Sequence, residues 1–196
     1  MENIWAVILA AGESKRMGTA KMLLPFNGST IIGNVIKNIL DAGANGIIVV
    51  LGAESERIIS EIRKYSVNFC INERFTEGML SSVICGIENL PPECSSVMIQ
   101  PGDQPLIKAE TIKSLIDGKE NSEFGIVVPV CNKKRGHPVV IDRKYSGEIR
   151  NLDSGKGLRS LLLLHPADVL EVETGDTGVL KDFDTYGDYL DEIHKK

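Results

Sequence analysis

The chain has 196 residues, of which 42% are hydrophobic and 25% are charged, and its formal net charge is −5 at pH 7. This length predicts one globular domain over residues 1–196, with enough apolar residues to fill a core on both faces of a sheet. The negative net charge argues against a general nucleic-acid binder, because such proteins hold the phosphate backbone with a basic surface.

The cysteines and the apolar runs indicate a reduced, cytoplasmic protein. The cysteines include no CxxC pair, which disfavours a zinc site and a disulfide framework; they are Cys70, Cys85, Cys94 and Cys131. Cys70 and Cys85 lie in apolar runs and are expected to be small core residues. The apolar run Ile4–Ala11 is too short for a signal peptide. No stretch approaches the roughly twenty apolar residues that span a bilayer, so no membrane association is expected.

The first half of the chain alternates apolar strands with amphipathic helices. Short apolar runs predict four buried strands: Ile4–Ala10, Ile47–Leu51, Asn68–Ile71 and Val97–Gln100. Apolar residues at helical spacing predict three helices between them: Ile31–Leu40, Ile58–Tyr65 and Leu80–Leu90. This alternation predicts an α/β fold, a Rossmann-like three-layer α/β/α sandwich with a mostly parallel sheet.

The second half is less regular and shows no repeat or linker. Its predicted helices are Glu110–Ile116, Leu158–Leu164 and Tyr186–His194. Its predicted strands are Ile126–Val130, Val139–Ile141, Val169–Val172 and Val179–Phe183. In open α/β sheets, ligands bind beyond the carboxyl ends of the strands. The loops after Ala10, Ile71 and Gln100 are therefore expected to meet at one site.

The loop after the first strand is suited to phosphate binding. Its small residues let the backbone approach a ligand, and its basic residues supply charge; the candidates are Leu9, Ala10, Ala11, Gly12, Ser14, Lys15, Arg16 and Lys21. Arg16 can grip two phosphate oxygens, and Lys21 offers a compact charge. The loop matches neither a Walker A motif nor GxGxxG. The alternative is a turn whose basic residues face water.

One aspartate is a candidate for holding Mg²⁺, and another acidic residue lies just before the last helix. Asp103 follows the fourth strand, where a carboxylate beside a triphosphate can hold the ion together with phosphate oxygens. Asp103 can equally be an ordinary residue of a Pro-bounded turn. Asp184 precedes the last helix, where it or Thr185 can cap the helix, and alternation places it on one face with Asp182.

Two further segments can contact the substrates. Gly78 opens the third helix, and Ser81 and Ser82 can read a nucleobase edge or can serve as helix caps. In the basic segment Lys133–Pro138, Arg135 and His137 offer donors to an anionic acceptor, and the alternative is a solvated turn.

The segment Leu9–Lys21 matches LAAGxSxRMGxxK and resembles the signature of the molybdenum-cofactor nucleotidyltransferases, the MobA-like NTP transferase family. Further landmarks in family order are Asn72 with Glu77–Ser82, Gly102–Pro105, Arg135–Pro138 and Asp182–Thr185. The resemblance covers the whole chain and implies the nucleotide-diphospho-sugar transferase type of fold. The LAAG sequence and the two-residue spacer before Lys21 are more similar to the cytidylyltransferase branch than to the guanylyltransferase branch.

The resemblance implies that CMP is transferred from CTP to molybdopterin cofactor with release of pyrophosphate. It implies catalytic roles for Arg16, Lys21 and Asp103, and a second metal carboxylate at Asp184. The family usually continues after Thr185 with Pro and an acid, whereas this chain has Tyr186 and Gly187. The alternatives are GTP as the donor, a sugar or alcohol phosphate as the acceptor, or a non-catalytic carrier that delivers the cofactor to a molybdenum hydroxylase.

Overall fold

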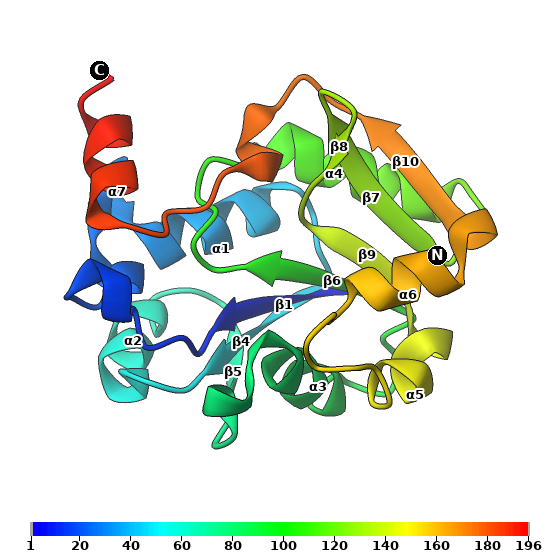
Figure 1. The fold of residues 1–196 in the computed structure, drawn as a ribbon, viewed down its shortest axis with the longest axis horizontal. Helices are drawn as coiled ribbons and strands as arrows, with labels where there is room; N and C mark the ends of the chain where they lie inside the picture. Colours follow the sequence, from blue (N-terminus) through cyan, green and yellow to red (C-terminus); the bar gives the residue numbers. More distant parts are fainter. Residues whose placement is uncertain (1, 196) are drawn as a thin grey trace.

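A mostly parallel eight-stranded sheet forms the centre of the computed structural model, which describes residues 2–195 (Figure 1). The strand order is β10-β7-β9-β6-β1-β4-β5, with β8 paired to β7 and β9 antiparallel to both of its neighbours. The strands are β1 Ile4–Ala10, β4 Gly46–Leu51, β5 Asn68–Ile71, β6 Ser96–Pro101, β7 Ile126–Cys131, β8 Lys134–Arg135, β9 Val139–Asp142 and β10 Val169–Glu173. A separate ribbon joins β2 Pro25–Phe26 to β3 Ser29–Thr30.

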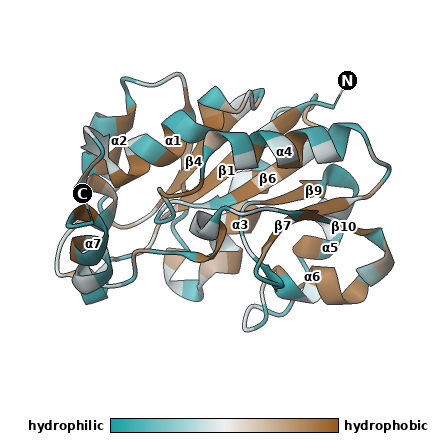
Figure 2. Cartoon of the chain, turned by 90° about the horizontal axis from the view of Figure 1, so that it is seen from above, coloured by the Kyte–Doolittle hydropathy of each residue, from teal (hydrophilic) through white to brown (hydrophobic). Residues whose placement is uncertain are grey.

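Helices cover both faces of the sheet, which confirms the predicted three-layer α/β/α fold (Figure 2). They are α1 Ile31–Asp41, α2 Ser55–Ile62, α3 Met79–Glu88, α4 Ala109–Glu120, α5 Ser146–Ile149, α6 Arg159–Leu164 and α7 Tyr186–Ile193. One core cluster packs α1, α2 and α4 on the sheet, and another packs α3, α5 and α6. Within residues 2–195, no helix combines the length and apolar character needed to cross a membrane.

The continuous apolar run of β1 arises because the strand is buried on both faces. Ile8 and Ala10 belong to the cluster under α1, whereas Val7 and Leu9 belong to the cluster under α3. The strand pairs in parallel with β4 and with β6, so Leu9 lies level with Pro101 at the carboxyl edge of the sheet. The loops after β1 and β6 therefore begin side by side.

The predicted strand Val179–Phe183 is wrong. A 3₁₀ helix occupies Thr177–Leu180, and the following residues run outside the sheet. The Asp176 carboxylate accepts a hydrogen bond from the backbone N–H of Gly178 at 2.9 Å, which holds this turn. The helix α2 also ends at Ile62, before the predicted end at Tyr65.

Asp168 fastens the segment between α6 and β10 to the sheet. Its carboxylate accepts hydrogen bonds from the Tyr145 hydroxyl and from the backbone N–H of Gly125, and it pairs with Lys144 at 3.0 Å. Burial alone would raise the pKa of Asp168, but these hydrogen bonds outweigh it and lower the pKa to about 2. The charged form is therefore the one that the fold stabilises.

Replacing Asp168 with alanine is expected to lower the free energy of unfolding at pH 7 by about 1–3 kcal/mol, because a charged acceptor of several hydrogen bonds is lost. A depressed carboxyl pKa stabilises the fold above the unfolded value and loses this effect as the pH falls through about 2. Urea unfolding at several pH values checks this. A stability difference that persists undiminished at the acid end would contradict the assignment.

Candidate nucleotide site

The basic loop after β1 is held in one shape by its own backbone. Ser14 and Gly18 both adopt left-handed conformations, with φ of 51° and 65°, on either side of the short turn Lys15–Met17. The Ser14 hydroxyl accepts a hydrogen bond from the backbone N–H of Lys21 at 3.3 Å. The Met17 side chain is buried against Phe26 and Phe183, which anchors the loop to the C-terminal segment.

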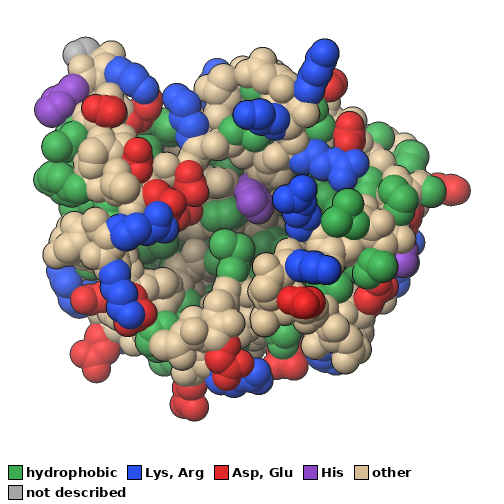
Figure 3. Space-filling model, viewed as in Figure 1, with side chains coloured by type: hydrophobic (Ala, Val, Ile, Leu, Met, Phe, Trp, Pro, Cys, Tyr) green, Lys and Arg blue, Asp and Glu red, His purple; other side chains and the backbone are tan. Residues whose placement is uncertain are grey.

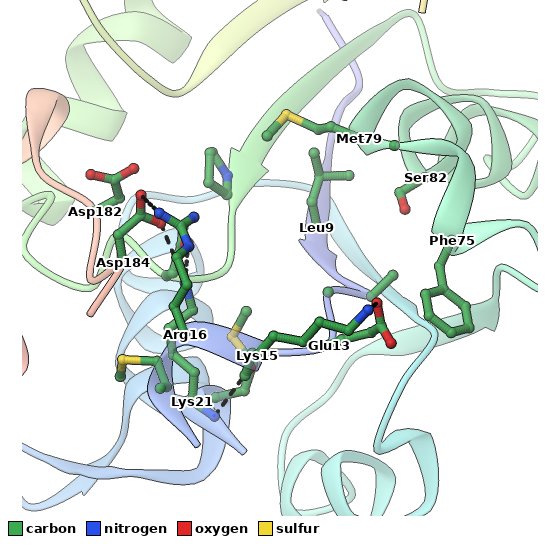
Figure 4. A pocket seen from close by; sticks show the side chains of 18 of the residues that line it. Leu9, Glu13, Lys15, Arg16, Lys21, Phe75, Met79, Ser82, Asp182 and Asp184 are labelled. Atoms are coloured by element: carbon green, nitrogen blue, oxygen red, sulfur yellow. Dashed lines mark hydrogen bonds and ion pairs between the residues drawn. The ribbon is translucent and has the colours of Figure 1, made fainter. Parts of the chain in front are cut away.

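Lys21 lies at the centre of a four-charge network. Its Nζ is 2.6 Å from Asp103 Oδ2 and 4.0 Å from Asp184 Oδ1. The Arg16 guanidinium also donates to Asp184 Oδ2 at 2.9 Å (Figure 4). The Lys21 side chain is only 10% exposed, whereas those of Lys15 and Arg16 are 77% and 69% exposed. Lys21 is therefore a buried cation, whereas Lys15 and Arg16 are solvent-exposed cations at the rim of the site.

One backbone bond brings the two carboxylates together. The N–H of Phe183 donates to the Asp103 carbonyl at 3.0 Å, so residues 182–184 run alongside the end of β6. The Phe183 ring is buried in edge-to-face contact with Phe26. Thr185 caps α7 through a reciprocal pair of hydrogen bonds with Asp188. Asp184 is therefore not used as the cap and faces the cavity (Figure 4).

The donor set fits a divalent cation held jointly with a polyphosphate. Asp103 and Asp184 lie 2.6 and 4.0 Å from the same ammonium nitrogen, and both line the same cavity. Within the described residues, no group of three or more His, Cys, Asp or Glu side chains is arranged to hold a metal alone. Mg²⁺ needs only one or two carboxylates, because phosphate oxygens and waters complete its octahedral shell.

These groups line a cavity of about 600 Å³ at the carboxyl edge of the sheet. Figure 3 shows this hollow with an apolar floor and charged side chains along its rim. Asp182 and Asp184 lie on one side of the cavity, and Phe75, Met79 and Ser82 lie on the other (Figure 4). The charged side suits phosphates and metal, and the less polar side suits a nucleobase.

The less polar side is built at the start of α3. Gly78 has φ of 103°, a conformation that side chains disfavour, and it turns the chain from residues 75–77 into the helix. The Asn72 amide donates to the hydroxyls of Ser81 and Ser82 at 2.9 and 3.0 Å. Neither serine caps the helix. Their hydroxyls instead tie α3 to the end of β5.

Most residues predicted from the sequence line this cavity; they are Leu9, Ala11, Gly12, Ser14, Lys15, Arg16, Lys21, Gly78, Ser82, Asp103, His137 and Asp184. The structure places three others elsewhere. Ala10 is fully buried in β1, and the Ser81 hydroxyl donates to the carbonyls of Arg74 and Gly78. Arg135 pairs with Glu171 at 2.7 Å and lines a second cavity rather than this one.

Sequence reasoning missed several lining residues, including Phe75, Thr76, Met79, Gln104 and Asp182. Met79 is 61% exposed, which is unusual for a large apolar side chain, but exposure is not visible in a sequence. Gln104 is buried, and its Oε1 has no hydrogen-bond partner within residues 2–195. A buried polar atom of this kind at a cavity wall is suited to a ligand contact.

A second cavity of about 940 Å³ lies between the β7–β8 hairpin and α6. His137 lines both cavities and so marks their junction. The second cavity has an apolar wall that includes Leu158 and Leu162, and its other lining residues include Lys133, Lys134 and Arg159. In the described part of the chain these three cations form no ion pair. Figure 3 shows basic side chains gathered over β8 and α6 beside the hollow.

The surroundings of His137 favour its neutral form. Burial lowers its pKa, although the negative charges of Asp103 and Asp182 act in the opposite direction. Its backbone N–H donates to the Val179 carbonyl at 3.0 Å, which fixes the strand entering β9 against the 3₁₀ turn. The imidazole can therefore exchange hydrogen bonds with a ligand without adding a charge.

Residues 6–169 match the family described as the MobA-like NTP transferase domain. The chain therefore belongs to this family of nucleotidyltransferases. It is 26% identical to the molybdenum cofactor cytidylyltransferase of Escherichia coli K12, over 97% of this chain and 95% of that protein. It is 27% identical to the nicotine blue oxidoreductase of Paenarthrobacter nicotinovorans, over 93% of this chain and 92% of that protein.

The solved structure of Rv0371c from Mycobacterium tuberculosis H37Rv is similar throughout, with a TM-score of 0.87, 27% identity and 98% of each chain covered. The same mycobacterial protein was solved in complex with manganese. That structure has a TM-score of 0.81 and 24% identity, and it covers 99% of this chain and 100% of its own. Asp182 and Asp184 lie beyond the residues that match the family, so their placement comes from the structure.

Proposed function

We propose that residues 1–196 form one Mg²⁺-dependent cytidylyltransferase domain, which transfers CMP from CTP to the phosphate of molybdopterin cofactor and releases pyrophosphate. The observation that carries this proposal is the placement of Lys21 between Asp103 and Asp184. A buried ammonium beside two carboxylates, at the end of a basic loop that contains glycines, is suited to binding a triphosphate and its metal ion. The name of the Escherichia coli relative and the LAAG sequence support CTP as the donor.

In this proposal the loop from Gly12 to Lys21 binds the β- and γ-phosphates. Lys21 and Arg16 then neutralise the charge that builds on the departing pyrophosphate, and their ion pairs with the carboxylates open to admit the ligand. Asp103 and Asp184 would hold Mg²⁺, which would further neutralise the phosphate oxygens. Gly78 and Ser82 contact the nucleobase on the other side of the cavity.

The second cavity binds the acceptor. An in-line attack on the α-phosphorus comes from the side opposite the pyrophosphate, and the second cavity meets the first at His137 and includes no residue of the basic loop from Gly12 to Lys21. The acceptor phosphate oxygen forms the new bond to phosphorus as the bond to pyrophosphate breaks. This phosphate is already deprotonated at neutral pH, so the reaction needs positioning rather than a general base. The neutral His137 orients it by hydrogen bonding.

Release of pyrophosphate from CTP, GTP, ATP and UTP, with Mg²⁺ and molybdopterin cofactor, tests the proposal. We expect release with CTP alone. Release with a different nucleotide would keep the chemistry and overturn the cytidylyl assignment. No release from any of the four would overturn the transferase with this acceptor and favour the carrier, because a carrier cleaves no nucleotide.

Replacing Arg159 with alanine is expected to raise the KM for molybdopterin cofactor about tenfold, because one charge-assisted contact to an anionic acceptor is lost. The KM for CTP is expected to stay unchanged, since Arg159 lines the second cavity and not the first. Steady-state kinetics with each substrate varied in turn gives both values. Arg150→Ala is the matched control, because Arg150 pairs with Glu88 away from both cavities. An increase confined to the KM for CTP would place the acceptor elsewhere.

A further inference from the structure

Two thiols from different elements lie in contact next to the segment that forms the less polar side of the first cavity. Cys70 is on β5 and Cys85 is on α3, and their Sγ atoms are 3.5 Å apart. Both are free cysteines; Cys70 is buried, whereas Cys85 is partly exposed. The sequence gives no hint of this pair, because the contact forms only when α3 packs on the edge strand.

The two cysteines flank the segment that forms the less polar side of the first cavity. Cys70 is two residues before Asn72, and Cys85 is one helical turn after Ser81 and Ser82. The Asn72 amide already bonds both serine hydroxyls, so β5 and α3 are joined at this point. Between the two cysteines, the chain contributes Phe75, Thr76, Gly78, Met79 and Ser82 to the cavity.

We propose that Cys70 and Cys85 form a site of reversible oxidation, at which a hydroperoxide converts the thiol pair into a disulfide that weakens nucleotide binding. The effect on nucleotide rests on the function proposed above, whereas formation of the disulfide does not. The other two cysteines, Cys94 and Cys131, are buried and serve as internal comparisons.

Oxidation of the pair takes place in two steps, and the environment of each sulfur determines which cysteine reacts first. Burial, together with the hydrogen bond to Cys85, raises the pKa of Cys70 to about 12, so this sulfur is held as the thiol and is not the first to react. The partly exposed Cys85 is the sulfur that a peroxide in solvent can reach. Cys85 therefore reacts first, and Cys70 resolves the product.

The chemistry balances with hydrogen peroxide as the oxidant. The Cys85 sulfur attacks one peroxide oxygen, the O–O bond breaks, and sulfenic acid and one water form. The Cys70 thiol then gives its proton to the sulfenic oxygen as its sulfur attacks the sulfenic sulfur; the S–S bond forms, the S–O bond breaks, and a second water leaves. Two thiols and one peroxide thus give one disulfide and two waters, and a dithiol reductant reverses the change.

The geometry explains why nucleotide binding weakens. A disulfide is about 2.05 Å long, so the two sulfurs must approach by about 1.5 Å from their contact distance. We expect this approach to draw the second turn of α3 toward β5 and to disturb the hydrogen bonds that join Asn72 to Ser81 and Ser82. Lys21 and Asp103 lie on other loops and keep their positions, so affinity changes more than turnover.

The test uses the full chain, reduced or treated with hydrogen peroxide. Peptide mass spectrometry without reductant is expected to find a Cys70–Cys85 link that dithiothreitol removes. Calorimetry is expected to show at least a fivefold increase in the Kd for CTP with Mg²⁺ after oxidation, restored by dithiothreitol. Cys85→Ser and Cys70→Ala are expected to lose both effects, and Cys94→Ser and Cys131→Ser to retain them; thermal melting verifies that each variant folds.

The outcomes separate the two proposals. No Cys70–Cys85 link in the oxidised wild type would overturn the oxidation site. A complete link with an unchanged Kd for CTP would overturn its effect on nucleotide binding. Failure of the reduced protein to bind CTP would overturn the proposed function and the affinity effect together, while the mapped link would still establish the oxidation site.

Discussion

Replacing Lys21 with alanine is expected to lower kcat by about 10²- to 10³-fold, a loss typical of removing one preorganised charge-stabilising group. Lys21 is the buried cation of the basic loop and contacts both candidate metal carboxylates. Without it, Asp103 and Asp184 face the triphosphate with less compensating positive charge. Pyrophosphate release under saturating CTP and acceptor measures the loss, and circular dichroism verifies the fold.

Lys15→Ala is the matched control for this variant. Lys15 belongs to the same loop and lines the same cavity, but its side chain is 77% exposed and pairs with Glu13. A solvated charge contributes little, so we expect less than about a fivefold change in kcat. Equal losses in the two variants would show that the loop acts through its total charge rather than through the buried position of Lys21.

Replacing Asp103 with asparagine is expected to lower kcat about 10²-fold or more and to raise the Mg²⁺ concentration for half-maximal activity about tenfold, because a neutral amide is a poorer ligand for a hard cation. The change keeps the shape of the side chain, so the backbone bond from Phe183 to the Asp103 carbonyl is retained. Titration of activity with Mg²⁺ at fixed CTP measures both quantities.

Asp117→Asn controls for the general effect of removing a negative charge. Asp117 is exposed on α4, where it pairs with Lys113 at 3.0 Å. Its variant is expected to keep the wild-type Mg²⁺ requirement. If Asp103→Asn loses turnover but titrates with Mg²⁺ like the wild type, Asp103 acts by positioning Lys21 and is not a metal ligand.

The spacing of apolar residues was sufficient to predict the layers of this fold. Burial determines both the continuous apolar runs of the strands and the helical spacing of the amphipathic helices. The strand β1 is apolar throughout since Val7 and Ile8 face different clusters, and α1 shows helical spacing since only one side of it is buried. The second half was harder to predict. Val179 is fully buried, and its apolar neighbours imitate a strand, yet Gly178 and Asp176 make a turn there.

Candidate site residues were predictable where they lie together in one loop, and less predictable where the fold brings distant segments together. The loop from Gly12 to Lys21 is contiguous, so its residue types and spacing could be recognised. Arg135 was expected beside an anion and lines the second cavity, but its pairing with Glu171 was not predictable, because it depends on β10 lying next to β7. Gln104 carries no sequence signal, because its unpartnered amide oxygen is a property of the packed cavity wall.

The backbone hydrogen bond between Phe183 and Asp103 joins the end of β6 to a segment that follows all of the strands in the chain. The last strand of the sheet ends at Glu173, so every strand has been synthesised before Asp184 joins the growing chain. A chain cut between β10 and Asp182 would keep all of its strands yet lack one of the two carboxylates beside Lys21. Such a cut would also separate the buried side chains of Val179 and Phe183 from the chain that they pack against, so the second carboxylate and part of the core depend on the same segment.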